Sequence, residues 1–361
     1  MGVCLKYPWK MKRRVGWKIG THAGLMIILS LVLSCCQVAI DQQEYDATNP
    51  PVELTGTDSL PAVGSPPVRE TPGAAEPGIE RLAKSPAPTF SLSAPTELAT
   101  VTAPARAART LTPGFDPTEW QSLPVLPELS PHARSVLRDG IALGHNPQAF
   151  SKIGDCESQT TWFLGDFDLG EQYYSLGQYE EELAPVIAYY RGSFNRLSLA
   201  AKPGFTAASL LSPIWADREV CLKGESPLEC EYRLHRPSMA FILIGTNDAS
   251  NPKTFEGHMR KVIELSLEQR ILPVLGTKAD NVEGDHAINA TLARLAYEYD
   301  VPLWNYWLAV QDLPGHGLQQ DGAHLTFAAP HFDRPGVLKN AWPVRNLNAL
   351  QILRRLMDET R

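Results

Sequence analysis

The chain has no basic tract outside its extreme N-terminus, and its net charge over 361 residues is −7. Proteins that bind nucleic acid through phosphate contacts carry clustered lysine and arginine, so this composition excludes that class. No close group of His, Asp and Glu has the spacing of a metal site, and His316 and His331 do not supply one. We therefore expect no metal and no cofactor. We also find no internal repeats.

Aromatic side chains are almost absent between Asp41 and Trp120, whereas sixteen of the thirty prolines lie between residues 50 and 131. Such a composition cannot bury enough apolar surface to offset its ordering entropy, and its Pro-Pro pairs favour extended chain. We therefore expect three parts: a membrane anchor over residues 1–40, a disordered Pro-rich linker over 41–120, and one globular domain over 121–361.

The N-terminus has the pattern of an export signal. Basic residues at 10–18 precede an apolar run at 23–33, which ends close to Cys35. A cysteine at this place is similar to a bacterial lipobox, which makes Cys35 the expected lipidation site. The alternative is an uncleaved anchor over Ala23–Ile40, because about 18 residues are just enough to span a bilayer. Both interpretations tether the domain to the membrane at the cell surface.

The globular part alternates strands and helices. Met239–Ile244 is a run of six apolar residues, which predicts a strand buried on both faces, as in a parallel sheet. The other expected strands are Ala149–Ile153, Ile271–Gly276 and Val301–Trp307. The expected helices are Pro131–Gly144, Tyr179–Tyr190 (kinked or broken by Pro185), Thr254–Arg270, His286–Tyr299 and Val344–Met357. This alternation predicts an α/β fold with helices on both faces of a parallel sheet.

Four polar blocks follow these elements in order. They are Gly154-Asp155-Cys156, the segment around Gly204, Gly245-Thr246-Asn247-Asp248, and Asp321-Gly322-Ala323-His324. The third block, taken alone, is more typical of a helix cap than of a functional site. Together they hold what acyl transfer needs: a nucleophile, a base, a carboxylate that orients the base, and donors for an oxyanion.

This order of blocks resembles the SGNH (GDSL-type) hydrolase superfamily, whose motifs are Gly-Asp-Ser, a Gly, Gly-x-Asn-Asp and Asp-x-x-His. The resemblance implies a flavodoxin-like three-layer α/β/α sandwich and hydrolysis of acyl or acetyl esters, many of carbohydrate or lipid. It implies catalytic roles for Cys156, His324 and Asp321, and an oxyanion hole formed by Cys156, Gly204 and Asn247. Asp155, Gly245 and Asp248 would support the site. The lipase elbow Gly-x-Ser-x-Gly is absent, as in that family.

One departure is important, because Cys156 stands where the family has its nucleophilic serine. A thiol beside a histidine at a helix start can become a good nucleophile. Ser158 is the nearest serine. Three hypotheses follow: a cysteine-dependent ester hydrolase, a weakened esterase, or a non-catalytic surface module that binds a glycan or peptide in the same cleft.

Cys221 and Cys230 are close in sequence around a loop that contains Gly and Pro, so in an exported protein we expect a disulfide rather than two thiols. The aromatic residues at 304–307 are expected to be core, with a sugar platform as the alternative, and Phe327 and His331 are expected to line the pocket. The expected partners are a small-molecule or glycan ester and the membrane, and we expect a monomer.

Overall fold

The computed structural model describes residues 116–159 and 162–360. The expected anchor, Cys35 and nearly all of the expected linker lie outside these residues. Within the described ranges, none of the helices has the length and apolar character needed to span a membrane.

The sheet has four strands, all parallel, in the order β1-β2-β3-β4. The strands are β1 (Asn146–Gly154), β2 (Pro237–Leu243), β3 (Leu272–Gly276) and β4 (Leu303–Trp304). Ala201 pairs with Gly154 in a single parallel bridge along the free edge of β1. That bridge occupies the place of one further edge strand, so the spatial order agrees with the predicted flavodoxin-like topology.

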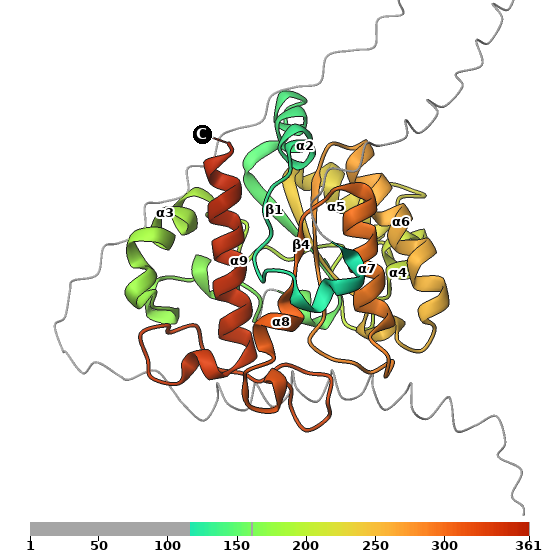
Figure 1. Cartoon of the computed structure of the whole chain (residues 1–361). Helices are drawn as coiled ribbons and strands as arrows, with labels where there is room; N and C mark the ends of the chain where they lie inside the picture. The colour runs from blue at the N-terminus through green and yellow to red at the C-terminus, as the bar shows by residue number, and fades with distance from the viewer. Residues whose placement is uncertain (1–115, 160–161, 361) are drawn as a thin grey trace, which may run out of the picture. The chain divides into compact units, whose positions relative to one another are not determined.

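Helices cover both faces of this sheet (Figure 1). They are α2 (Pro131–Ala142), α3 (Glu180–Tyr189), α4 (Ala207–Leu211), α5 (Pro227–His235), α6 (Pro252–Glu268), α7 (Ala287–Tyr299), α8 (Tyr306–Val310) and α9 (Ala341–Asp358). Figure 1 shows α3 and α9 on one side and α4, α6 and α7 on the other. The predicted three-layer α/β/α sandwich is confirmed.

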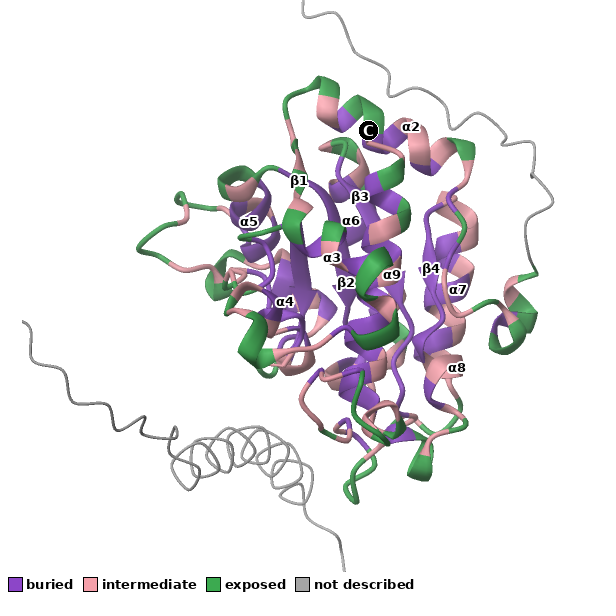
Figure 2. Cartoon of the chain, turned by 90° about the vertical axis from the view of Figure 1, so that its left-hand side faces the viewer, coloured by how far each residue is buried: buried purple, intermediate pink, exposed green. Residues whose placement is uncertain are grey.

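Strand β2 separates two apolar cores. Met239 and Phe241 pack into the core beneath α2, α3 and α9, whereas Ala240 and Ile242 pack into the core beneath α4 to α7. Successive side chains of a strand point to opposite faces, so a strand with a helical layer on each side must be apolar throughout. All seven residues of β2 are buried, as the purple strands at the centre of Figure 2 show.

Two expectations about the elements need correction. The expected break at Pro185 does not occur, because α3 continues through it and buries Leu183, Val186 and Ile187, which offsets the cost of about 3 kcal/mol for an internal proline. The strand expected over Val301–Trp307 is only Leu303–Trp304, since the chain turns at once into α8.

Asn305 explains that early turn, and it also corrects the domain boundary. Its amide Nδ2 donates to the carbonyls of Trp120 and Leu123 at 2.9 Å each, and its Oδ1 caps α8 by accepting from the N–H of Leu308 in the first turn. Trp120 is buried and packs edge-on against Trp307, with ring centroids 5.1 Å apart. Trp120, assigned above to the linker, therefore belongs to the domain.

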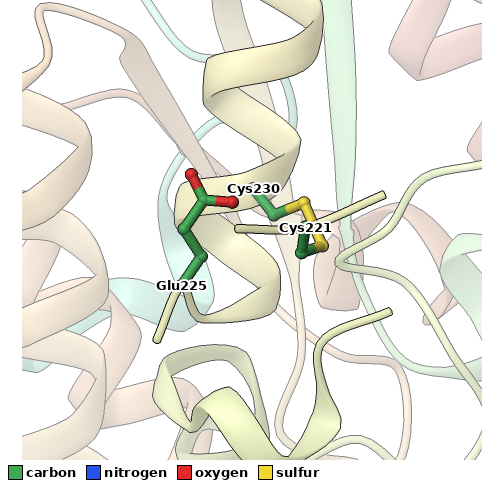
Figure 3. A group of neighbouring side chains, drawn as sticks. All are labelled: Cys221, Glu225 and Cys230. Atoms are coloured by element: carbon green, nitrogen blue, oxygen red, sulfur yellow. A yellow bond between two sulfur atoms is a disulfide. The ribbon is translucent and has the colours of Figure 1, made fainter. Parts of the chain in front are cut away.

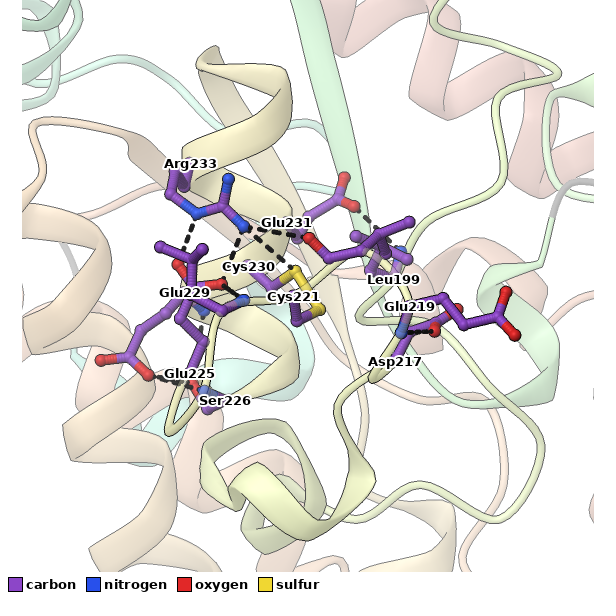
Figure 4. Close-up of a disulfide and its surroundings, with 12 residues drawn as sticks. Leu199, Asp217, Glu219, Cys221, Glu225, Ser226, Glu229, Cys230, Glu231 and Arg233 are labelled. Carbon is purple, nitrogen blue, oxygen red and sulfur yellow. Dashed lines mark hydrogen bonds and ion pairs between the residues drawn. A yellow bond between two sulfur atoms is a disulfide. The ribbon is translucent and has the colours of Figure 1, made fainter. Parts of the chain in front are cut away.

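The expected disulfide is present. The sulfurs of Cys221 and Cys230 are 2.06 Å apart and their Cα atoms 5.3 Å apart. Glu225 lies beside the bridge (Figure 3) and forms an ion pair with Arg233 (Figure 4). These two cysteines and Glu225 are the one group with metal-ligand geometry among the described residues, and the disulfide already occupies both sulfurs.

Replacing Cys221 and Cys230 by serine together is expected to lower the free energy of unfolding by about 2.5 kcal/mol. The bridge closes a loop over a sequence separation of 9, and opening it returns chain entropy to the unfolded state. The melting temperature should then fall by roughly 5 to 10 °C. Calorimetry of the oxidised, reduced and doubly substituted proteins checks this. A wild type that melts at the same temperature with and without reductant would contradict it.

Candidate active site

The turn that carries Cys156, the expected nucleophile, begins where β1 ends. Asp155 caps a short 3-10 turn, Cys156–Ser158, and its carboxylate accepts the N–H of Glu157 at 3.1 Å. Asp155 is buried, whereas Cys156 is partly exposed and is not in a disulfide. The cap holds Cys156 at the carboxyl edge of the sheet, which is where α/β folds place their sites.

Ser158 is not the nucleophile, because its side chain is fully buried and its hydroxyl donates to the carbonyl of Leu243 at 3.1 Å. This bond ties the turn to β2. It also explains Gly154, where an added Cβ would lie 2.1 Å from the Leu243 carbonyl oxygen and 2.2 Å from Ser158 Oγ. Glycine is therefore required directly before Asp155.

His324 and Asp321 lie in the loop that precedes α9. Asp321 Oδ2 accepts a hydrogen bond from His324 Nδ1 at 2.5 Å, and its Oδ1 accepts the N–H groups of Ala323 and His324 at 3.0 Å each. Partial burial raises the pKa of Asp321, but these hydrogen bonds outweigh it and leave the pKa below its ordinary value. Asp321 is thus an anion that fixes the orientation of the ring and directs Nε2 away from itself.

Cys156 and His324 line the same small cavity. Its volume is about 20 Å³, and its other lining residues are Glu157, Trp162, Gln319, Leu325 and Trp342. Residues more than 160 positions apart meet here because the β1 edge and the C-terminal loop converge. The cavity has room for one water molecule or a group of similar size.

The second and third blocks are linked to each other. Asn247 Nδ2 donates to the carbonyl of Phe205 at 3.0 Å, directly after Gly204. The Asp248 carboxylate accepts the N–H of Ala207 at 3.1 and 3.3 Å. Burial raises the pKa of Asp248 to about 6, partly opposed by that N–H. These contacts hold the two proposed oxyanion segments in a fixed relation.

Gly245 begins the third block with φ of 143°, a conformation that L side chains rarely adopt, and an added Cβ would meet Ile288 at 2.6 Å. Next to it, the Thr246 hydroxyl donates to Asp280 at 2.7 Å. Lys278 Nζ lies 2.6 Å from a carboxylate oxygen of Asp280 and of Glu283, and none of the three side chains is more than 6% exposed. Sequence reasoning missed this charge network, although its position directly after a buried strand could have indicated it.

Several other side chains near the site were also missed. Trp162, Trp342 and Gln319 line the cavity, and Arg345 of α9 binds Glu157 at 3.0 Å. Glu157 follows Cys156 and was detectable from its position. The tryptophans and Arg345 carry no local signal, because only packing brings them there.

The expected surroundings of the pocket are only partly found. Trp304 and Tyr306 are fully buried, as a core assignment requires, and they offer no platform to a sugar. Phe327 is 43% exposed and its ring centroid lies 6.3 Å from that of Trp162. Neither Phe327 nor His331 is among the residues that line the cavity.

Asp155→Asn is expected to flatten the dependence of stability on pH. Burial, together with the neighbouring Glu157 carboxylate, raises the pKa of Asp155 to about 8, against about 3.9 in an unfolded chain. Between these values the folded state binds the extra proton, so the free energy of unfolding falls as pH rises from 4 to 8. Asparagine keeps the oxygen that accepts the Glu157 N–H but removes the titration. Chemical denaturation at several pH values measures both slopes, and equal slopes would contradict the assignment.

Comparison with known proteins gives structural neighbours only. No family model and no curated protein matches the chain. A putative lipolytic protein of the G-D-S-L family from Desulfitobacterium hafniense is 15% identical, with a TM-score of 0.36, over 57% of this chain and 99% of that one. A GDSL-like lipase from Bacteroides thetaiotaomicron is 12% identical, with a TM-score of 0.35, over 63% of this chain and 98% of that one.

Both neighbours are GDSL-type lipolytic proteins. That is the family whose motifs the four blocks resemble. Identities and TM-scores this low carry no conclusion about activity, so the chemistry has to be argued from the geometry of the site.

Proposed function

We propose that this protein is an ester hydrolase in which Cys156 is the nucleophile, His324 the general base and Asp321 the residue that orients the base. One observation carries the proposal: Cys156 and His324 line one cavity, while Asp321 lies 2.5 Å from the ring nitrogen Nδ1 of His324. A nucleophile, a base and an orienting carboxylate are the minimum for acyl transfer.

The reaction proceeds in two halves. His324 Nε2 takes the thiol proton, and the sulfur of Cys156 forms a bond to the ester carbonyl carbon, whose oxygen becomes an oxyanion. The proposed donors to that oxygen are the backbone N–H groups of Cys156 and Gly204 and the second N–H of the Asn247 amide, whose first N–H binds the Phe205 carbonyl. The carbon–oxygen bond then breaks, and His324 returns its proton to the departing alcohol. Water, deprotonated by His324, hydrolyses the thioester and restores the thiol.

The thioester is the species to detect. After acid quenching of the protein with p-nitrophenyl acetate, mass spectrometry should find one acetyl group on the peptide that contains Cys156. The label should disappear with time as product forms. An acetylated Cys156 that never turns over would indicate a binding module with a reactive thiol. Hydrolysis without any label on this peptide would exclude the thiol mechanism.

The substrate class we propose is short acyl esters, such as acetylated carbohydrate. The cavity of about 20 Å³ beside Cys156 is bounded by Trp162 and Trp342, which leaves no room for a long chain. The ratio of acetyl to octanoyl hydrolysis measures this limit. Trp342→Ala should lower the ratio, and a wild type that prefers octanoyl esters would contradict the proposal.

We also propose that the domain is exported and tethered at the cell surface through Cys35. The pattern of residues 1–40 supports this, and so does the Cys221–Cys230 disulfide, because such bonds persist in oxidising compartments. Metabolic labelling with palmitate tests the anchor: Cys35→Ser should lose the label, and a labelled variant would refute lipidation at this residue.

A further inference from the structure

Glu157, the residue after Cys156, is paired with an arginine from the far end of the chain. Arg345 Nη1 lies 3.0 Å from Glu157 Oε2, and the two side chains are only 5% and 13% exposed. Arg345 is in the second turn of α9, while Glu157 is in the turn that carries the nucleophile. The pair therefore joins α9 directly to that turn.

Aromatic rings hold the guanidinium of Arg345 in place. Its central carbon lies 5.0 Å from the ring centroid of Phe163, and 5.3 Å from those of Tyr306 and Trp342. Trp342 also lines the cavity that contains Cys156 and His324. The cation is thus fixed against the wall of the site.

Stability alone does not account for this pair. Removing two charges from water is costly, and an apolar pair of similar size is often as stable or more stable. The contacts of this pair do not fully offset the cost of removing its charges from water, because Glu157 Oε1 and Arg345 Nε are buried and have no hydrogen-bond partner among the described residues. The charges must be explained by something other than packing.

The charged groups around the thiol indicate what the Glu157–Arg345 pair does. Asp155 holds a proton at neutral pH, since its pKa is about 8. Burial raises the pKa of Glu157, while Arg345 and His324 lower it and Asp280 raises it further. Asp280 is ion-paired with Lys278, and Asp321 is bound to His324. Arg345 is therefore the cation that compensates the carboxylate next to Cys156.

We propose that Arg345 and Glu157 are positioning residues for Cys156: their ion pair anchors the nucleophile turn to α9 and neutralises the charge beside the thiol. The inference rests on the proposed function only in taking Cys156 as the nucleophile. It assigns neither residue a contact with substrate.

Glu157→Gln separates this role from a structural one. The substitution keeps the size of the side chain and leaves the Arg345 cation uncompensated near the thiol, which favours the thiolate. The pH midpoint of Cys156 alkylation should fall by about one unit. Glu157→Gln combined with Arg345→Gln removes both charges and should return the midpoint to the wild-type value.

The measurement is the rate of alkylation by iodoacetamide against pH, followed on the Cys156 peptide by mass spectrometry in the full chain. Arg196→Gln is the matched control, because Arg196 pairs with the buried Glu231 at 2.7 Å beside the same strand β1. It should leave the midpoint unchanged. Melting curves of every variant verify that the domain is folded.

The outcomes are distinct. An unchanged midpoint in Glu157→Gln, or the same shift in the single and double variants, would overturn the proposal. Alkylation does not require ester hydrolysis, so a shift without esterase activity supports this inference and contradicts the proposed function. Esterase activity without a shift supports the proposed function and contradicts this inference. A Glu157→Gln protein that does not melt cooperatively while the double variant does would also support the pairing, because it shows that an uncompensated Arg345 is not tolerated.

Discussion

Cys156→Ala should lower kcat for hydrolysis of p-nitrophenyl acetate by at least about 10³-fold. In sites of this kind the nucleophile, base and orienting carboxylate act as a unit, so loss of the nucleophile removes nearly all the contribution of covalent catalysis. The residual rate would come from the oxyanion donors and binding alone. Alanine leaves the turn intact, since the cap from Asp155 to the Glu157 N–H and the Ser158 bond to Leu243 do not involve the thiol.

Cys156→Ser is the informative companion. Serine is the nucleophile of the family that this chain resembles. Its oxygen–carbon bond to the acyl group is shorter than the sulfur–carbon bond, so the oxyanion would form at a different position. We expect activity above Cys156→Ala and below wild type, measured as kcat/KM on the same ester. Equal trace rates in wild type and both variants would contradict the thiol mechanism and favour a non-catalytic module that binds a glycan or peptide.

Asp321→Asn should lower kcat by about 10² to 10⁴-fold with little change in KM. The amide can present an N–H to His324 Nδ1, which would place the imidazole proton on Nε2 and remove its ability to accept the thiol proton. Asparagine retains Oδ1, which accepts the N–H groups of Ala323 and His324 at 3.0 Å, so the loop keeps its shape. The loss is thus attributable to the base and not to folding.

Asp285→Asn is the control for that change. Asp285 also accepts a backbone N–H, from Ala287 at 3.0 Å, in an exposed turn before α7. It should leave kcat and the melting temperature unchanged. In Asp321→Asn the imidazolium loses the stabilisation that the carboxylate provides, so the acidic limb of the pH–rate profile should move to lower pH. A pH–rate profile that only scales down uniformly would argue against this role.

The sequence determined the features that depend on short-range interactions. Ser130 caps α2 through a bond to the N–H of Ala133, three residues on, and Asp321 reaches His324 over the same distance. The disulfide closes over a separation of 9. The unbroken apolar run made β2 recognisable as a buried parallel strand. Its side chains point alternately to the two faces of the sheet, and each face packs against an apolar layer. From these features, the α/β fold and the four polar blocks that follow its elements could be predicted.

Only the tertiary structure decided which distant residues complete the site. Ser158 cannot act as a nucleophile because its hydroxyl donates to a carbonyl of β2. Trp120 belongs to the core because the Asn305 amide donates to its backbone carbonyl. Arg345 meets Glu157 across a separation of 188 residues. No local pattern encodes such a contact, since its free energy comes from burial between elements that pack only once the sheet has formed. Sequence spacing therefore indicated the proposed reacting groups, while tertiary packing determined which charge lies beside them and which side chains line their cavity.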